Sequence, residues 1–363
     1  MINNRKKTVY VGISGGVDSS VSAGILKEKG YNVVGVFIDI WQPGFTECTS
    51  AEDRIDAMKV CNVLKIPFKT FDAKKLYENK VVNYMIEEYR FGRTPNPDIM
   101  CNKFIKFGIF FNWAIEQGAD LVATGHYARI DNSKEDEPYL LKGLDSNKDQ
   151  SYFLWSISKE ALSKTIFPVG EMKKEEVRMK AKSLNLPTAN KKDSQGICFL
   201  GKVDIKEFLS KYIYPKKGDV LDENSKVIGF HEGAWFYTIG QRHGFTVNKK
   251  DPNSKPLYII KKNISKNTIT VSPNTQNHTF NKVSLSNENW IPQKPLEISK
   301  EKNLTCLTRY RQKERTCNLL FSNNKKTLVI FNEPQSGLTE GQSVVIYNGN
   351  HCLGGGIIDK IIE

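Results

Sequence analysis

The stretch that decides the fold is VYVGISGGVDSSVSAGILKEKG, residues 9–30. An apolar run typical of a β-strand ends at Ser14, two glycines and an aspartate follow, and a helical pattern begins near Ser19. Glycines let the backbone approach a ligand closely, and the N-terminal end of a helix carries partial positive charge, so this turn suits a phosphate group. Neither GxxxxGK followed by Ser or Thr nor GxGxxG occurs here. A tight turn with Asp18 or Ser19 as the helix N-cap is the alternative interpretation.

The region around this turn alternates between strand-like and helix-like segments. Apolar runs rich in β-branched residues predict four strands, at residues 7–14, 32–39, 67–73 and 120–130. Segments with apolar residues three or four positions apart predict the helices, at residues 20–30, 51–65, 75–92 and 103–118. Strands separated by helices of this length pair in parallel, so the predicted fold class is α/β with a doubly wound parallel sheet.

The second half of the chain has a different character. Residues 150–205 look mostly helical, with a polar loop near their end. From about residue 215, short alternating runs are separated by Asn, Gly and Pro, which is typical of antiparallel β structure. We therefore expect three domains: an α/β domain at 1–205, a small β-rich domain at 206–278 and a β-barrel at 279–363.

Composition and charge narrow the class of protein. The 363-residue chain has a net charge of +13, and residues 201–363 hold 24 Lys and Arg against 15 Asp and Glu. This excess indicates either a polyanion partner such as nucleic acid or a lysine-rich solvated surface. Seven scattered cysteines without a CxxC pair argue against a secreted disulfide scaffold and a zinc ribbon. No apolar run suits a membrane span and no leader precedes the first strand, so we expect a cytoplasmic protein without membrane contact.

The glycine turn resembles a known nucleotide-binding loop. Residues 14–20, SGGVDSS, are similar to the PP-loop of the ATP-pyrophosphatase superfamily, whose members split ATP between the α and β phosphates to adenylate an oxygen. Further segments resemble, in the same order, those of the tRNA-specific 2-thiouridylases of this superfamily, and they span essentially the whole chain. These segments are GRTPNPDIMCNKFIKFG at 92–108, LVATGHYAR at 121–129, KDQSYFL at 148–154, KKDSQGICFLG at 191–201, FYTIGQRHG at 236–244 and TRYRQ at 308–312.

This resemblance implies a reaction on tRNA. Members of the family first adenylate the C2 oxygen of the wobble uridine (U34) with ATP in the presence of Mg²⁺, which releases pyrophosphate. They then replace that oxygen with sulfur. The implied partners are the tRNA anticodon and a protein that donates persulfide sulfur. The alternatives are another PP-loop ligase that acts on a small molecule and a nucleotide-binding RNA adaptor with structural cysteines.

Two cysteines have sequence surroundings that suit reactivity. Cys101 follows two prolines in a loop and precedes a helix expected near Asn102, whose N-terminus would stabilise a thiolate. Cys198 lies in a polar loop outside any periodic apolar face. The resemblance implies that Cys101 is the nucleophile and Cys198 the persulfide carrier, with a transient disulfide between them that a reductant resets. It leaves open whether the persulfide attacks C2 directly or releases sulfide. Buried structural roles are expected for Cys61, Cys306 and Cys317.

The remaining site residues follow from the matching motifs. Asp98 is a candidate acid or base, with a turn or cap aspartate as the alternative. The resemblance implies that Asp18 engages Mg²⁺ and that Ile38 contacts adenine, although many relatives have methionine there. We expect His126 to be structural. The implied ATP contacts are Gly12, Ile13, Ser14, Gly15, Gly16, Val17, Asp18, Ser19, Ile38 and Gly125.

The implied tRNA contacts lie in three of the matching segments. They are Asn96, Pro97, Asp98, Lys148, Asp149, Gln150, Arg309 and Tyr310. The last pair has a physical basis of its own, because Arg binds phosphate and Tyr stacks on a base. An exposed hairpin of plain surface residues is the alternative for this pair.

Overall fold

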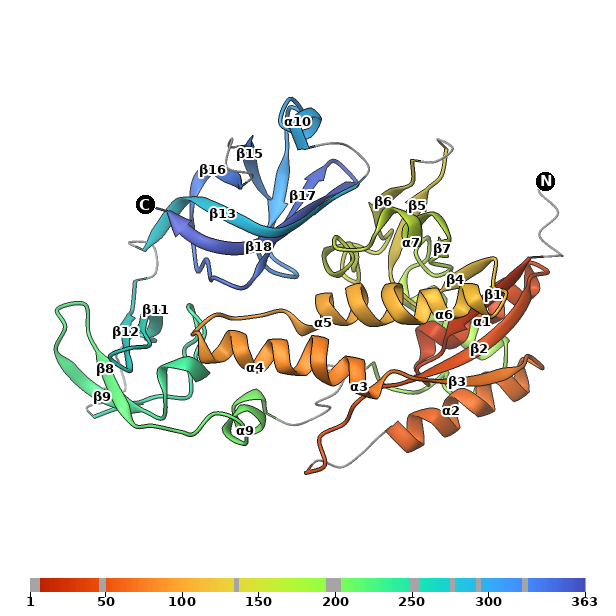
Figure 1. The fold of residues 1–363 in the computed structure, drawn as a ribbon, viewed down its shortest axis with the longest axis horizontal. Helices are drawn as coiled ribbons and strands as arrows, with labels where there is room; N and C mark the ends of the chain where they lie inside the picture. Colours follow the sequence, from red (N-terminus) through yellow and green to blue (C-terminus); the bar gives the residue numbers. More distant parts are fainter. Residues whose placement is uncertain are drawn as a thin grey trace.

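A computed structural model describes residues 7–45, 50–133, 137–193, 204–248, 255–274, 278–291, 295–321 and 326–362. Within these residues the strands form three sheets, which correspond to three parts of the chain. Figure 1 shows the parallel-sheet part with its helices, a small β part reached by α4 (Asn83–Arg90), and a blue β part at the C-terminal end.

The first sheet is parallel throughout and has the strand order β3-β2-β1-β4-β7. Its central strands are almost continuously apolar and buried, as expected for a sheet that is covered on both faces. The predicted doubly wound α/β class is therefore confirmed. The strands are β1 (Thr8–Gly12), β2 (Asn32–Asp39), β3 (Phe68–Asp72), β4 (Leu121–Ala123) and β7 (Thr165–Ile166).

Most helices of this part connect the parallel strands, and the last two follow β7, the final strand of the sheet. Two of them are built from consecutive segments: α3 (Lys74–Tyr77), η2 (Glu78–Val82) and α4 form one, and α5 (Pro97–Met100), η3 (Cys101–Ile109) and α6 (Phe110–Glu116) form the other. In both, the middle segment is π-helical. The others are α1 (Val17–Glu28), α2 (Ser50–Val63), η4 (Ser151–Phe153), α7 (Lys159–Ser163), α8 (Lys174–Ser183) and α9 (Ile205–Ser210).

Two sequence predictions in this part are wrong in detail. The strand expected at 120–130 stops after Ala123, and β5 (Ala128–Asp131) turns away to pair with β6 (Tyr139–Lys142). The break has a steric reason, because the backbone at Gly125 lies directly against the start of α1. The mostly helical interpretation of 150–205 also omitted β7, a short strand that adds to the sheet.

The small central part is a five-stranded sheet with the order β10-β9-β8-β12-β11. Its hairpins are antiparallel as predicted, but β12 and β8 pair in parallel, so the purely antiparallel expectation is wrong at that contact. β8 and β12 belong to different hairpins and no tight turn joins them, so these two strands can pair in either direction. The elements are β8 (Gly218–Leu221), β9 (Val227–His231), η5 (Ala234–Phe236), β10 (Thr246–Val247), β11 (Tyr258–Asn263) and β12 (Thr268–Ser272).

The C-terminal part is a closed barrel, as predicted. Its strands follow the order β13-β16-β15-β14-β17-β18, and pairing of β13 with β18 closes the ring around a buried apolar core. The β5–β6 hairpin of the first part joins this barrel, because His351 of β18 pairs with Leu141. The elements are β13 (Thr279–Trp290), α10 (Pro295–Ile298), β14 (Thr305–Leu307), β15 (Arg315–Phe321), β16 (Thr327–Ser336), β17 (Ser343–Asn348) and β18 (His351–Ile362).

Among the residues that the structure describes, none of the helices combines the length and the apolar character that a membrane span requires.

Candidate active site

The glycine turn lies where ligands bind in open parallel sheets. β1 has β2 on one side and β4 on the other, so the chain reverses its winding direction between β1 and β4. The carboxyl ends of the strands beside such a switch point form the usual ligand crevice. β1 runs directly into the turn and then into α1, whose N-cap is Gly16. The interpretation with Asp18 or Ser19 as N-cap is therefore wrong, and Gly16 contributes no side-chain cap to the helix N-terminus.

Hydroxyl groups stabilise the turn from within. The Ser14 amide donates to Ser19 Oγ at 3.2 Å, and the two hydroxyl oxygens are 3.3 Å apart. Ser20 Oγ donates to the Gly16 carbonyl at 2.7 Å. Ile13 and Val17 are buried, so only their backbone groups can face a ligand. Serine hydroxyls and buried apolar anchors therefore fix the backbone of a glycine turn at a helix N-terminus, which is the arrangement that binds anions.

Gly15 is required by the backbone conformation and packing of this loop, whereas a Cβ on Gly12 would make only ordinary contacts. Gly15 has φ +74°, and a Cβ there would lie 2.5 Å from the Asp53 carbonyl oxygen of α2. Gly12 is the last residue of β1, and a Cβ on it would be 3.6 Å from Ile38 Cδ1. Ile38, the predicted adenine contact, thus lies at the end of β2 beside the start of the loop. The structure brings these two predicted residues together.

Gly125 joins the loop from the neighbouring strand. A Cβ at this position would lie 2.5 Å from the Ser19 amide nitrogen and 2.7 Å from the Asp18 carbonyl carbon. The segment after β4 therefore packs directly on the first turn of α1. This close approach gives Gly125 a packing role, and its predicted nucleotide contact stays a prediction.

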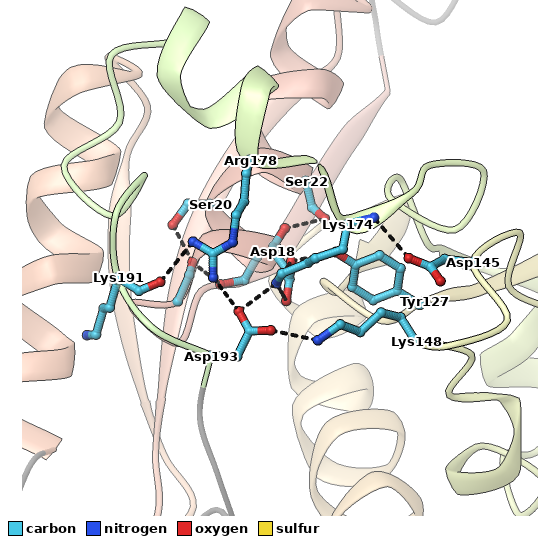
Figure 2. Close-up of polar contacts among 12 residues, drawn as sticks. Asp18, Ser20, Ser22, Tyr127, Asp145, Lys148, Lys174, Arg178, Lys191 and Asp193 are labelled. Atoms are coloured by element: carbon cyan, nitrogen blue, oxygen red, sulfur yellow. Dashed lines mark hydrogen bonds and ion pairs between the residues drawn. The ribbon is translucent and has the colours of Figure 1, made fainter. Parts of the chain in front are cut away.

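Asp18 is held by two partners from distant parts of the chain. Tyr127 donates its hydroxyl to Asp18 Oδ1 at 2.7 Å, and Lys174 Nζ lies 2.7 Å from Oδ1 and 2.9 Å from Oδ2 (Figure 2). Burial, followed by the charge of Asp18, raises the pKa of Tyr127, so its hydroxyl stays protonated and acts as a donor. Lys174 is the first residue of α8, and only 12% of its side chain is exposed. Lys174 is not predictable from sequence, because one lysine among several in a basic amphipathic helix carries no local signal.

Lys174 also belongs to a cluster of cations around Asp193. Its ammonium group lies 2.9 Å from Asp193 Oδ1, Arg178 Nη2 is 2.7 Å from the same oxygen, and Lys148 Nζ is 2.7 Å from Oδ2. Burial alone would raise the pKa of Asp193, but the hydrogen bonds from Lys148 and Lys174 lower it to about 2. Lys148, a predicted tRNA contact, thus reaches toward the loop side of the site in Figure 2.

The two residues after Lys148 hold the same region together. Asp149 accepts hydrogen bonds from the Gly143 and Ser151 amides at 2.9 and 3.0 Å, and burial raises its pKa against their effect. Gln150 Oε1 accepts from the Tyr127 amide at 2.9 Å, and the Gln150 amide donates to the Tyr127 carbonyl. These contacts set the position of Tyr127 and through it that of Asp18. A tRNA contact at Asp149 and Gln150 remains a prediction.

Cys101 lies inside a helix rather than in the predicted loop. The helix begins at Pro97 with Asn96 as its N-cap, and Asn96 Oδ1 accepts from the Ile99 amide at 3.3 Å. An Asn cap followed by proline at the first position is a standard helix start, so the expectation of a start near Asn102 is wrong. Cys101 is 3% exposed, and Asp98 sits in the first turn, where a carboxylate faces the free amides.

The helix of Cys101 contacts the segment beside the glycine loop through Lys106 and His126. Lys106 lies five positions after Cys101, about one turn further along the π-helical segment. Lys106 Nζ is 3.4 Å from His126 Nε2, and His126 Nδ1 is 2.7 Å from Thr124 Oγ1. Burial, then the charge of Lys106, lowers the pKa of His126, which keeps the imidazole neutral. An ammonium group only donates, so Nε2 accepts and the Nδ1 proton is directed to Thr124. His126 is structural, as expected.

Both later parts of the chain hold the loop that precedes Cys101. The Thr94 amide donates to the Glu340 carbonyl at 2.8 Å, and Gln342 Nε2 donates to the Thr94 carbonyl at 2.8 Å. From the central part, Lys262 Nζ donates to the Gly92 carbonyl at 2.8 Å. The loop before Asn96 is therefore positioned by the central sheet and the barrel together.

The predicted pair Arg309 and Tyr310 lies at another joint between these parts. Arg309 Nη2 donates to the Ile239 carbonyl of the central part and the Gly337 carbonyl of the barrel, both at 2.8 Å. The ring of Tyr310 lies 4.5 Å from that of Phe153. Arg309 and Tyr310 are partly buried and only Arg311 of this Arg-Tyr-Arg segment is exposed, so the plain-surface interpretation does not describe its first two residues. Their predicted contact with tRNA is untested.

The other cysteines behave as expected where the structure describes them. Cys61, Cys306 and Cys317 are buried in α2, β14 and β15. Burial raises the pKa of Cys61 to about 12, so its thiol is unreactive. Cys198 lies outside the described residues. Within the described ranges, no group of three or more His, Cys, Asp and Glu side chains is placed to hold a metal ion.

We predict that Lys262→Met destabilises the contact between the central sheet and the loop before Cys101, and with it the fold. Lys262 Nζ donates to the Gly92 and Tyr237 carbonyls, and burial lowers its pKa to about 8. Loss of two hydrogen bonds from a charged group should lower the free energy of unfolding by about 2–3 kcal/mol, measured by urea unfolding. Lys261→Met, at the exposed neighbouring position, is the control and should change it by less than about 0.5 kcal/mol. Equal stability of the two variants would contradict the prediction.

Comparison with known proteins identifies the family. Three domain models match in succession: a tRNA methyl transferase HUP domain at residues 7–202, a tRNA methyl transferase PRC-barrel domain at 206–273 and an aminomethyltransferase beta-barrel domain at 280–358. Full-length relatives named tRNA-specific 2-thiouridylase MnmA include that of Oceanobacillus iheyensis, 44% identical over 100% of this chain and 98% of the relative. The chain belongs to the MnmA family.

Other MnmA proteins match over nearly the same length. Those of Enterococcus faecalis and Bacillus subtilis are each 43% identical, and they cover 100% and 98% of this chain and 98% and 95% of their own length. A solved U34-tRNA thiolase NcsA from Methanococcus maripaludis is 20% identical over 60% of this chain and 70% of that chain, with a TM-score of 0.37. The family assignment rests on the full-length MnmA relatives.

Proposed function

We propose that the protein is a tRNA-uridine 2-sulfurtransferase. It adenylates the C2 oxygen of the wobble uridine with ATP and then replaces that oxygen with sulfur, giving 2-thiouridine, AMP and pyrophosphate. The observation that carries the proposal is the 44% identity to a protein named tRNA-specific 2-thiouridylase over the whole length of the chain. We also propose that the protein acts in the cytoplasm, because its proposed substrate is tRNA.

The glycine loop supports the use of ATP. Its backbone lies at the switch point of the sheet, at the uncapped N-terminus of α1, and Gly125 closes it from the side of β4. Ile38, beside Gly12, offers an apolar contact for the adenine ring. Asp18 suits Mg²⁺, because a carboxylate oxygen next to bound phosphates is the ligand set this ion prefers. When bound, Mg²⁺ would neutralise phosphate charge.

Adenylation explains why a thiolating enzyme needs ATP. An oxygen at C2 of a pyrimidine is a poor leaving group, and bound to AMP it becomes a good one. The base must leave the anticodon stack to reach the loop and Cys101 together, so we expect an extruded uridine. Asn96, Pro97 and Asp98 start the helix of Cys101, which agrees with a role at the target base. Asp98 is the proposed acid or base for proton transfer there.

Sulfur transfer uses the two cysteines of the matching motifs. Cys198, in the role that the family resemblance implies, receives sulfur from a donor protein as a persulfide. Cys101 attacks the Cys198 sulfur, the S–S bond of the persulfide breaks, and its outer sulfur leaves either as sulfide or already bonded to C2. A Cys101–Cys198 disulfide remains in both routes, and a dithiol reductant returns it to two thiols.

Nucleoside mass spectrometry tests the proposal directly. Unmodified tRNA is incubated with the full chain, ATP, Mg²⁺ and a sulfur source, then digested to nucleosides. We expect 2-thiouridine only when all components are present. AMP production without tRNA would favour a ligase that acts on a small molecule. Absence of 2-thiouridine beside an active control enzyme would refute the proposal.

The basic second half predicts salt-sensitive tRNA binding. Residues 201–363 carry 24 Lys and Arg against 15 Asp and Glu. If several of these contact phosphates, the tRNA dissociation constant should rise by about tenfold or more between 50 and 200 mM salt, because bound counterions are released. Fluorescence anisotropy with labelled tRNA measures this rise. A flat response would mean that the excess charge is only surface.

A further inference from the structure

We propose that Lys148, Lys174 and Arg178 form the binding site for the pyrophosphate part of ATP, and that the Asp193 carboxylate occupies this site in the absence of nucleotide. The inference deepens the proposed function and rests on it for the identity of the nucleotide. We call these three basic residues the pyrophosphate cluster.

The geometry of the pyrophosphate cluster is that of an oxyanion site. Three cationic groups from different segments converge on one carboxylate, at 2.7 Å from Lys148, 2.9 Å from Lys174 and 2.7 Å from Arg178. A carboxylate needs only one such partner to be neutralised. One guanidinium group and two ammonium groups on a single anion are typical of sites for phosphate. Asp193 therefore marks where an anion with more charge would be bound.

The pyrophosphate cluster lies beside the glycine loop. Lys174 Nζ bridges Asp193 and Asp18, and Asp18 is in the first turn of α1 next to the uncapped Gly16 (Figure 2). One lysine side chain thus separates the Asp193 position from the loop that is proposed to bind phosphates. Arg178 also donates to the Ala189 and Lys191 carbonyls, which fixes its guanidinium in place. A chain of two phosphates can extend from the loop to this cluster.

The acidic groups around the cluster have identifiable partners. Lys148, Lys174 and Arg178 directly contact the carboxylates of Asp18 and Asp193, so three cations meet two carboxylates there. Asp145 accepts from the Lys174 backbone amide at 3.0 Å and thereby anchors the start of α8. The acids of α2, Asp53 and Asp56, pair with Lys191 at 2.7 and 2.8 Å. Pyrophosphate carries several negative charges, so it competes well against the single carboxylate of Asp193.

Calorimetric titration of the full chain with inorganic pyrophosphate and Mg²⁺ tests this proposal. We expect Lys174→Met to weaken pyrophosphate binding by about tenfold or more, because a charge-assisted hydrogen bond to an anion is lost. The control is Lys180→Met, on the same helix, whose lysine pairs with Glu28 of α1 at 2.6 Å. It should bind pyrophosphate within about twofold of the wild type.

Asp193→Asn separates a binding role from a purely structural one. This variant removes the competing charge and leaves a side chain of the same size, so pyrophosphate should bind several-fold more tightly. A structural ion-pair network predicts weaker binding or no change. Thermal unfolding of each variant shows whether it is folded. No measurable binding to the wild type, or no tightening in folded Asp193→Asn, would overturn the proposal.

The titration is independent of the thiolation assay. It contains neither tRNA nor a sulfur source, so a failure to form 2-thiouridine leaves its result intact. Conversely, if the enzyme thiolates tRNA but substitution of Lys174 and Asp193 leaves its affinity for pyrophosphate unchanged, only the proposal about the pyrophosphate cluster is refuted. The two proposals therefore fail in distinguishable ways.

Discussion

Cys101→Ser should abolish 2-thiouridine formation and leave ATP binding intact. A serine hydroxyl in this helix cannot attack the persulfide sulfur at neutral pH, because the thiolate is the reactive form of cysteine and serine has no comparable anion. Cys101 lies in η3, a segment separate from the glycine turn. Its helix contacts the region beside the turn through Lys106 and His126, so the substitution leaves the turn itself unchanged. Nucleoside mass spectrometry measures the product, and an ATP-induced rise in melting temperature measures nucleotide binding.

The matched control is the same substitution at Cys61. This thiol is equally buried, in α2, and burial raises its pKa to about 12. Cys61→Ser should lower stability, because a hydroxyl replaces an apolar contact, but it should still thiolate tRNA. Thiolation by Cys101→Ser above the level of the enzyme-free reaction would remove Cys101 from the chemistry. Cys198→Ser should match Cys101→Ser if Cys198 carries the persulfide.

Gly15→Ala should destabilise the glycine loop and eliminate ATP binding. Gly15 has φ +74°, and a left-handed conformation costs an L-residue about 1–2 kcal/mol. The new Cβ would also lie 2.5 Å from the Asp53 carbonyl oxygen, so α2 or the loop must move. The free energy of unfolding should therefore fall by more than about 2 kcal/mol. The loop amides would no longer converge, and ATP should no longer raise the melting temperature.

Gly16→Ala separates the backbone effect from a general effect of added bulk. Gly16 has φ −93° and ψ 165°, a conformation open to any residue, and its Cβ would meet only Ser14 Oγ at 3.4 Å. Because alanine is a poorer N-cap than glycine, the free energy of unfolding of Gly16→Ala should fall by about 1 kcal/mol or less, well short of the loss in Gly15→Ala. If Gly15→Ala proves as stable as Gly16→Ala and still responds to ATP, the required conformation of the loop has been misassigned.

The helix of Cys101 starts at Pro97 and not near Asn102 as predicted, and this difference shows how far local sequence signals reach. Asn96 and Pro97 together form a recognisable helix start, so the signal for the correct boundary was present. The two prolines in this segment also favour a loop, and this competing signal leads to the wrong boundary. The split of the strand at 120–130 had no such signal, because β5 leaves the parallel sheet to join a barrel built from residues far along the chain.

Local periodicity and turn chemistry were sufficient to determine the α/β class, the glycine loop and the buried character of Cys61, Cys306 and Cys317, because each depends on neighbours a few positions away. The contacts of Asp18 with Lys174, of Gly92 with Lys262 and of Arg309 with Gly337 were decided only by the tertiary structure. A surface lysine and a lysine that holds a loop look the same in sequence. Which role each takes depends on long-range packing, which brings a carboxylate or a carbonyl within reach of its ammonium group.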